Sequence, residues 1–137
     1  MARDLIHNAV KNALINDGWC ITDAPYTIEY EGVKVYADLA AERTLAAEKE
    51  GQEIAVEVKS FLSPSFMRDL ENAVGQYNIY KSYLKRTAPG RKLYLAISDV
   101  VYERFFKKPA VTIILEEYEV ALLVVDILQE EIVLWTK

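Results

Sequence analysis

The sequence predicts a single mixed α/β domain in which helices alternate with strands. Its 137 residues are close to the usual size of one domain, and no repeat or linker divides residues 1–137. Apolar residues make up 52% of the chain, and their spacing changes between the helical period and the two-residue period of strands. The predicted order is a helix, three strands, a helix, a strand, a helix and C-terminal strands. This order is typical of a domain built from two or three layers.

The first predicted element is a helix over residues 3–16. Its apolar residues recur at helical spacing: Leu5, Ile6, Ala9, Val10, Ala13 and Leu14. Asp17 and Gly18 end this helix, because glycine readily takes the left-handed conformation that closes a helix. A short extended stretch over residues 19–23 follows, and Pro25 interrupts it.

An antiparallel meander is predicted between residues 26 and 61, where the apolar residues alternate. Gly32 marks its first turn and Gly51 its second. One predicted strand covers residues 33–40. In the other, Ile54, Val56 and Val58 alternate with Ala55, Glu57 and Lys59. We expect these two strands to pair.

A long helix is predicted after residues 63–65, with a serine as its N-cap and Pro64 at its first helical position. Its core stripe consists of Phe66, Leu70, Ala73, Val74, Tyr77 and Leu84. A strand over residues 92–98 comes next, followed by a helix that Asp99 caps. Pro109 breaks that helix, and a short helix over residues 111–117 follows. Residues 120–126 and 131–135 close the chain as a strand pair.

Composition excludes several classes of protein. A net charge of −5 argues against a protein that coats nucleic acid nonspecifically. Basic residues cluster in one part of the sequence: Lys81, Lys85, Arg86, Arg91 and Lys92. They form either a local basic surface or solvated helix ends and loops. No apolar run approaches the roughly 20 residues of a membrane span, and the N-terminus does not resemble a secretory signal. A single cysteine cannot form an internal disulfide, so we expect a cytoplasmic protein.

One group of residues could carry chemistry: Asp38 together with Glu57 and Lys59. Residues two apart on a strand share a face, so Glu57 and Lys59 project together. An antiparallel register whose paired numbers add to an odd value would bring Asp38 to that face. Two carboxylates and an ammonium suit hydrolysis of a phosphodiester with Mg²⁺. A glutamate and a lysine at this spacing also occur on any half-exposed strand.

These residues resemble the PD-(D/E)XK nuclease superfamily, and nearly the whole chain resembles the XisH family, the fdxN element excision controlling factors of cyanobacteria. The similarity rests on five stretches: Arg3–Lys11, Asp17–Trp19, Tyr36–Glu42, Ile54–Phe61 and Gly75–Tyr77. It implies a restriction-endonuclease-like fold with a central mixed sheet flanked by helices.

The resemblance also implies roles for individual residues. Asp38 and Glu57 would be ligands of Mg²⁺ or Mn²⁺, and Lys59 would be the catalytic lysine. Gln76 would be the polar helix residue near the active site, and His7 would replace the usual acidic side chain of the first helix, unless Asp4 does. The sequence departs from the superfamily pattern at Ala37, where a proline commonly precedes the aspartate.

Family resemblance implies a role in programmed excision of a DNA element during heterocyst differentiation, beside a site-specific recombinase and a XisI protein. Two functions remain open: a metal-dependent endonuclease, or a noncatalytic accessory factor that binds other proteins. A small-molecule enzyme ranks below both, because the sequence contains no cofactor motif. The apolar C-terminal strands suggest a homo-oligomer or a contact with XisI.

Overall fold

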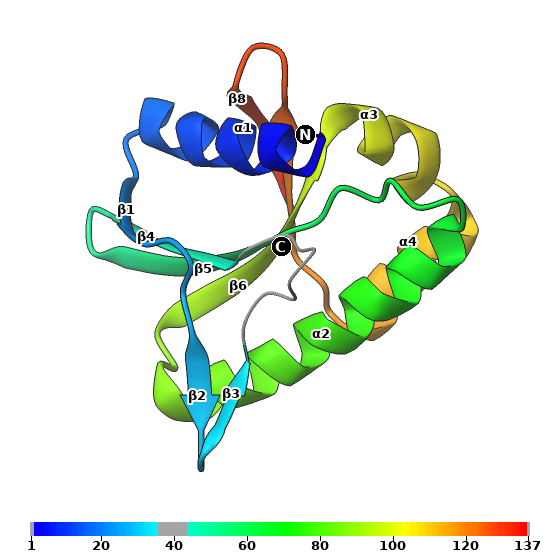
Figure 1. The fold of residues 1–137 in the computed structure, drawn as a ribbon. Helices are drawn as coiled ribbons and strands as arrows, with labels where there is room; N and C mark the ends of the chain where they lie inside the picture. Colours follow the sequence, from blue (N-terminus) through cyan, green and yellow to red (C-terminus); the bar gives the residue numbers. More distant parts are fainter. Residues whose placement is uncertain (1, 36–43, 137) are drawn as a thin grey trace.

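A computed structural model of the chain describes residues 2–35 and 44–136, and its centre is a six-stranded mixed sheet (Figure 1). The strand order is β1-β4-β5-β6-β7-β8. β5 to β7 run parallel to one another, whereas the other neighbouring pairs are antiparallel. The strands are β1 (Cys20–Asp23), β4 (Thr44–Lys49), β5 (Gln52–Val58), β6 (Arg91–Ser98), β7 (Leu122–Asp126) and β8 (Glu131–Trp135). The predicted mixed sheet and the predicted C-terminal strand pair are confirmed.

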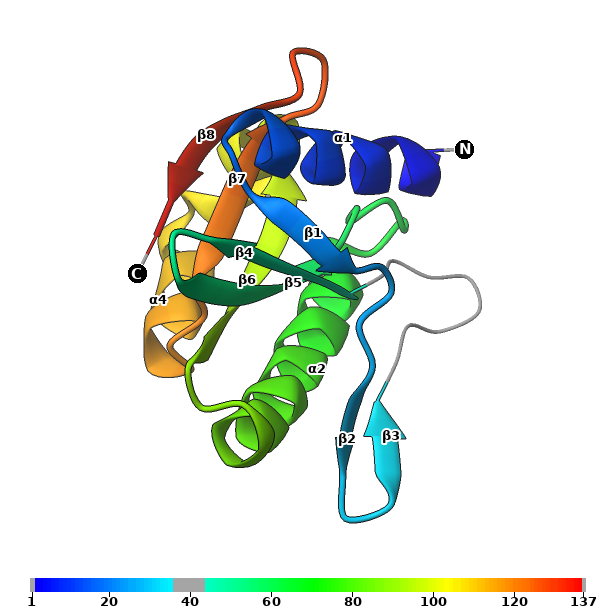
Figure 2. The same ribbon diagram turned by 90° about the vertical axis from the view of Figure 1, so that its left-hand side faces the viewer.

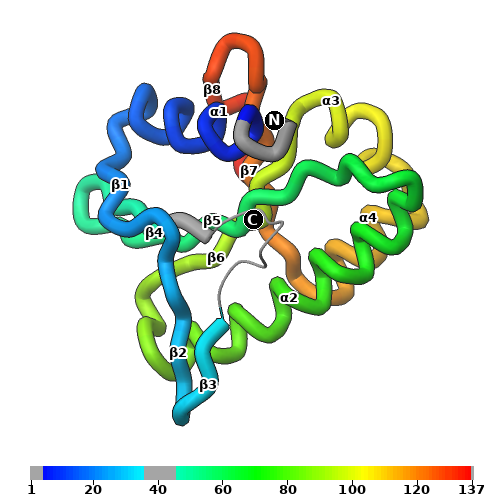
Figure 3. Tube along the Cα trace, in the orientation of Figure 1, coloured from blue at the N-terminus to red at the C-terminus, as the bar shows by residue number. Residues whose placement is uncertain are grey.

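Helices cover both faces of this sheet, which gives three layers (Figure 2). On one face, α1 (Ala2–Asn16) packs its buried residues against the even-numbered residues of β5. The other face is covered by α2 (Phe66–Thr87) and α4 (Pro109–Glu117). Between β6 and α4 the chain forms the short helix α3 (Asp99–Val101) and the π-helix η1 (Tyr102–Phe106). The tube trace in Figure 3 shows α1 and α2 separated by the sheet. None of the helices in the described ranges combines the length and apolar character of a membrane span.

The prediction of one meander between residues 26 and 61 is wrong for the described residues. β2 (Ile28–Tyr30) pairs with β3 (Val33–Val35) in a separate two-stranded sheet that leans on α2. The partner of β5 is instead β4, which was not predicted. The turns were placed correctly, since Gly32 and Gly51 both have a φ of +83°. β4 escaped prediction because two of its buried residues are alanines, which favour strands only weakly.

Serine side chains begin two of the helices, and they correct two predicted details. Ser65 caps α2, so Pro64 precedes the cap and is not the first helical residue. Ser98, rather than Asp99, caps α3, because its hydroxyl accepts the N–H of Val101 at 3.1 Å. Both hydroxyls satisfy backbone donors that the first helical turn leaves without partners.

Replacing Ser65 with alanine should lower the free energy of unfolding by about 1 kcal/mol, because the Arg68 N–H loses the hydroxyl oxygen at 3.2 Å. Urea denaturation measures this change. Ser82→Ala is the matched control: Ser82 is an exposed residue inside the same helix, where alanine is the better helix former. Equal losses in the two variants would contradict the capping role.

Candidate functional site

Glu57 and Lys59 meet at the C-terminal end of β5, on the face that α2 covers. Ala55 belongs to the apolar cluster on the α2 side, whereas Ile54, Val56 and Val58 belong to the cluster on the α1 side. Glu57 therefore projects toward α2. The Lys59 N–H donates to the Ala96 carbonyl at 3.0 Å, which extends the pairing with β6 by one residue. Lys59 Nζ lies 3.8 Å from Glu57 Oε2, so the predicted shared face is confirmed for this pair.

Both charged groups of this pair are largely removed from water. The Glu57 side chain is 3% exposed and the Lys59 side chain is 17% exposed. Burying two charges costs free energy that their mutual attraction often fails to recover, so such a pair does little for stability. The buried pair is therefore a candidate site for recognition or chemistry, and its functional role stays a prediction.

Asp38, the third member of the predicted group, lies outside the described residues. Within the described part, Thr44 of β4 pairs with Glu57 of β5. Their residue numbers add to an odd value, which is the parity that the shared-face prediction requires. This pairing belongs to β4 and not to a strand through Asp38, so the place of Asp38 in the site stays a prediction.

Gln76 lies half-buried on α2, the helix that covers the face of Glu57. Its Oε1 atom is buried and, within the described ranges, accepts no hydrogen bond. Buried amide oxygens nearly always have a donor, so an open acceptor here needs an explanation. A bound water or substrate group could supply that donor. The site role of Gln76 is therefore compatible with its position and stays a prediction.

Tyr77 follows Gln76 and shows how closely α2 covers this face. Its hydroxyl donates to the Leu93 carbonyl at 2.8 Å and accepts the Ala121 N–H at 3.0 Å. Burial raises the pKa of Tyr77 to about 12, against the hydrogen bond from Ala121, and the charge of Glu57 adds to the rise. The tyrosine is thus a core residue, as its helical spacing predicted.

His7 comes from the opposite layer. It lies half-buried on α1, whose neighbouring residues pack against the α1 side of the sheet, away from the face of Glu57. The helix that carries His7 therefore lies on the face of the sheet opposite to the one toward which Glu57 projects. A contribution from His7 would have to reach the strand ends from the α1 side, and this role stays a prediction.

Phe61 directly follows the site pair and has a backbone conformation that the sequence did not predict. Its φ is +56°, in the left-handed region that bulky side chains rarely adopt. The ring is buried against Phe66 and Phe106, with centroid distances of 5.5 and 5.2 Å. These contacts hold the turn that directly follows Lys59. Sequence patterns contain no signal for a left-handed phenylalanine, because the tertiary contacts impose it.

The donors of the described site fit a divalent metal only in part. Residues 2–35 and 44–136 contain no group of three or more histidine, cysteine, aspartate or glutamate side chains arranged to hold an ion. Mg²⁺ is commonly bound by one or two carboxylates together with substrate phosphates. Glu57 supplies one such carboxylate, and Asp38 would have to supply the second.

A cavity of about 710 Å³ lies between α2, α4 and the beginnings of β6 and β7. Four of the clustered basic residues line it (Lys81, Lys85, Arg91 and Lys92), as do Glu116 and Glu119. Burial lowers the pKa of Lys81, whose Nζ donates to the Tyr118 carbonyl at 2.8 Å. This lysine joins α2 to the C-terminal end of α4, so the cluster is partly structural rather than a uniform basic surface.

The chain is similar in sequence and in structure to known proteins of one family. The sequence model of the XisH protein family matches residues 1–133. The crystal structure of an XisH family protein from Nostoc punctiforme PCC 73102 is 40% identical, with a TM-score of 0.90, and the match covers 98% of this chain and 100% of that one. The structure of an fdxN element excision controlling factor protein from Anabaena variabilis is 41% identical, with a TM-score of 0.89 and coverages of 98% and 99%. A comparison with curated proteins found no match.

Proposed function

This chain belongs to the XisH family, and on that premise we propose that it is a DNA-processing factor that takes part in excising a DNA element. The solved relative from Anabaena variabilis is called an fdxN element excision controlling factor, and it resembles this chain over nearly its whole length. We further propose that the fold is of the restriction-endonuclease type and that the protein hydrolyses phosphodiesters with Mg²⁺ or Mn²⁺. The buried Glu57 carboxylate, 3.8 Å from the Lys59 ammonium, is the observation that carries this proposal.

In the proposed reaction, Glu57, Lys59 and Asp38 act together on the scissile phosphate. Glu57 and Asp38 would hold the metal ion, which supplies a Lewis acid that polarises a phosphoryl oxygen. Lys59 would place its ammonium against the charge that develops on the phosphate, in a setting where little water competes. Glu57 also keeps that ammonium in place before substrate binds.

Two further residues complete the proposed site. The open acceptor of Gln76 Oε1 would orient a water molecule toward the phosphate. His7 would take the place of the acidic side chain that the superfamily carries on its first helix. Both assignments rest on the family resemblance together with the half-buried positions of these residues.

A second function is a noncatalytic accessory factor that acts through protein contacts. The net charge of −5 disfavours extensive contact with DNA. β8 lies at an edge of the sheet, where Val133 is 51% exposed, and Leu128 in the adjoining hairpin is 85% exposed. An exposed apolar edge strand can pair with another chain. The partner would be a XisI-like protein, a site-specific recombinase or a second copy of this chain.

Metal-dependent cleavage separates these two functions. Labelled branched, single-stranded and duplex DNA would be incubated with the full chain and Mg²⁺ or Mn²⁺, and in parallel with EDTA. We expect cleavage that EDTA abolishes and that Glu57→Gln lowers about 100-fold or more, because the amide is a poor ligand for the metal. Glu103→Gln, which changes an exposed glutamate on η1, is the matched control and should cleave normally.

The accessory function predicts a different result. Wild-type protein, shown to be folded by its circular dichroism spectrum, would cleave none of the three substrates with either metal. Cleavage of equal rate in wild type and Glu57→Gln would also contradict the proposed site, because it would locate the hydrolytic activity elsewhere.

A further inference from the structure

Another cavity, of about 610 Å³, lies on the opposite face of the sheet, beyond the C-terminal end of α1. Its lining includes three aromatic residues, Trp19, Tyr94 and Trp135. Ile54 and Tyr94 place it on the α1 side of β5 and β6, near the beginnings of both strands. Glu57 lies near the other end of β5, on the α2 side, so this cavity is separate from the proposed hydrolytic site.

The three aromatic rings contact one another along one wall of the cavity, with interplanar angles of 71° between Tyr94 and Trp135 and 43° between Trp19 and Trp135. Tyr94 and Trp135 meet edge to face with their centroids 4.8 Å apart, and Trp19 is tilted against Trp135 at 5.8 Å. Trp19 is buried, whereas Tyr94 and Trp135 are half-buried and keep part of their surface open. Flat aromatic surfaces open to a cavity of this size are typical of sites that bind small planar ligands.

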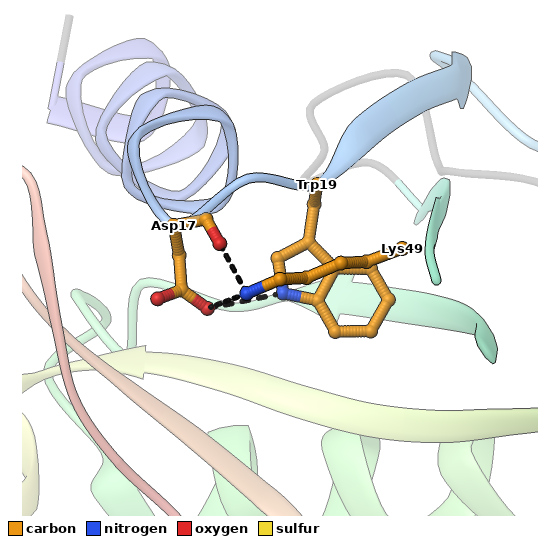
Figure 4. A network of polar contacts seen from close by, with 3 residues as sticks. All are labelled: Asp17, Trp19 and Lys49. Atoms are coloured by element: carbon orange, nitrogen blue, oxygen red, sulfur yellow. Dashed lines mark hydrogen bonds and ion pairs between the residues drawn. The ribbon is translucent and has the colours of Figure 1, made fainter. Parts of the chain in front are cut away.

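The orientation of Trp19 is fixed by polar contacts at the rim of the cavity (Figure 4). Its Nε1 donates to Asp17 Oδ2 at 3.2 Å, and Lys49 Nζ lies 3.4 Å from the same oxygen. The Lys49 ammonium also donates to the Asp17 carbonyl. The indole is therefore held in place before any ligand arrives, which lowers the entropy lost on binding.

Charge pairing leaves one positive and one negative side chain available in this lining. Asp17 is paired with Lys49, and Glu53 is paired with Arg91 at 3.4 Å. Lys92 and Glu50 line the cavity and form no ion pair with any residue in the described ranges. Lys92 Nζ lies over the Tyr94 ring, 5.1 Å from its centroid, so a cation contacts the aromatic residues of this cavity.

We propose that this cavity binds a nucleotide, with the base on the Tyr94–Trp135 wall and the phosphate at Lys92. A nucleobase offers the planar π-surface that aromatic side chains recognise, and its phosphate suits the neighbouring ammonium. Glu50 can accept a hydrogen bond from an amino group of the base or from a sugar hydroxyl. The ligand is either a free nucleotide or one nucleotide of a single-stranded DNA. This assignment goes beyond the proposed excision function and needs no metal.

Intrinsic fluorescence provides a specific test, because both tryptophans of the chain line this cavity. The full chain in EDTA would be titrated with deoxycytidine 5′-monophosphate and with oligo(dC) of about ten nucleotides. We expect saturable quenching of tryptophan emission. Lys92→Gln should weaken binding about tenfold, whereas Lys34→Gln, which removes an exposed positive charge on β3, should leave the affinity unchanged.

The two ligands identify the source of the nucleotide. Much tighter binding of the oligonucleotide supports a site for single-stranded DNA, and equal affinities support a free nucleotide. Absence of quenching by both ligands at millimolar concentration would overturn the proposal. Equal weakening by Lys92→Gln and Lys34→Gln would also overturn it. Because EDTA is present throughout, neither result bears on metal-dependent hydrolysis.

Discussion

Replacing Lys59 with methionine is expected to remove both metal-dependent cleavage and part of the stability of the fold. Cleavage should fall about 100-fold or more, because the developing charge on the phosphate loses its ammonium. The free energy of unfolding should fall by about 3 kcal/mol, because the Glu57 carboxylate, at 3% exposure, loses a cation 3.8 Å away. Methionine keeps the length of the lysine stem, so the loss reports the charge rather than a cavity.

A double variant separates the two effects of this substitution. In Glu57→Gln/Lys59→Met both charges are absent, and we expect most of the stability to return while cleavage stays lost. Urea denaturation of the four proteins gives the coupling free energy between the two side chains. If the losses of the single variants simply add in the double variant, the two charges do not interact and the proposed site loses its main support.

Local patterns predicted the parts of the fold that local interactions determine. The stripe of α2 was read correctly because apolar residues at helical spacing can be buried together only on a helix. Glu57 and Lys59 were placed on one face because the two-residue period of a strand leaves no alternative. Each of these inferences needed only residues that are close in sequence.

Pairing between distant segments could not be predicted in the same way. Alternation in residues 33–35 fits any strand, but these residues pair with β2 rather than with β5, and Val33 is 51% exposed. Ala46 and Ala47 are fully buried in β4, where their small side chains gave no strand signal. The choice between these partners depends on how α2 and the sheet pack, and a single sequence does not contain that information.

The candidate site likewise contains one pair that local geometry predicts and other residues that it does not. The Glu57–Lys59 pair follows from strand geometry, whereas Gln76 and His7 were assigned through family resemblance. The structure then shows that the two helices that carry them lie on opposite faces of the sheet. Layer assignment depends on the crossover of the chain after β5, which residue spacing within α1 or α2 does not reveal.

Tyr77→Phe is expected to be among the most destabilising conservative substitutions in the core. The hydroxyl bonds both the Leu93 carbonyl and the Ala121 N–H, and it thereby joins α2 to the beginnings of β6 and β7. Phenylalanine would leave both buried backbone groups without this partner, which should cost about 3 kcal/mol of unfolding free energy. Tyr118→Phe is the matched control, because Tyr118 is 46% exposed. The free energy of unfolding of this variant should be nearly that of the wild type.

The same hydroxyl predicts how stability depends on alkaline pH. Burial raises the pKa of Tyr77 to about 12 in the folded protein, from the ordinary tyrosine value of 10.0. A raised pKa means that the folded state holds the proton more tightly, so this contribution is complete below pH 10 and declines as the pH rises toward 12. Urea denaturation across this range should show a steeper loss of stability for wild type than for Tyr77→Phe. Equal slopes would contradict the prediction, because the variant lacks the titrating hydroxyl while both proteins keep every other tyrosine.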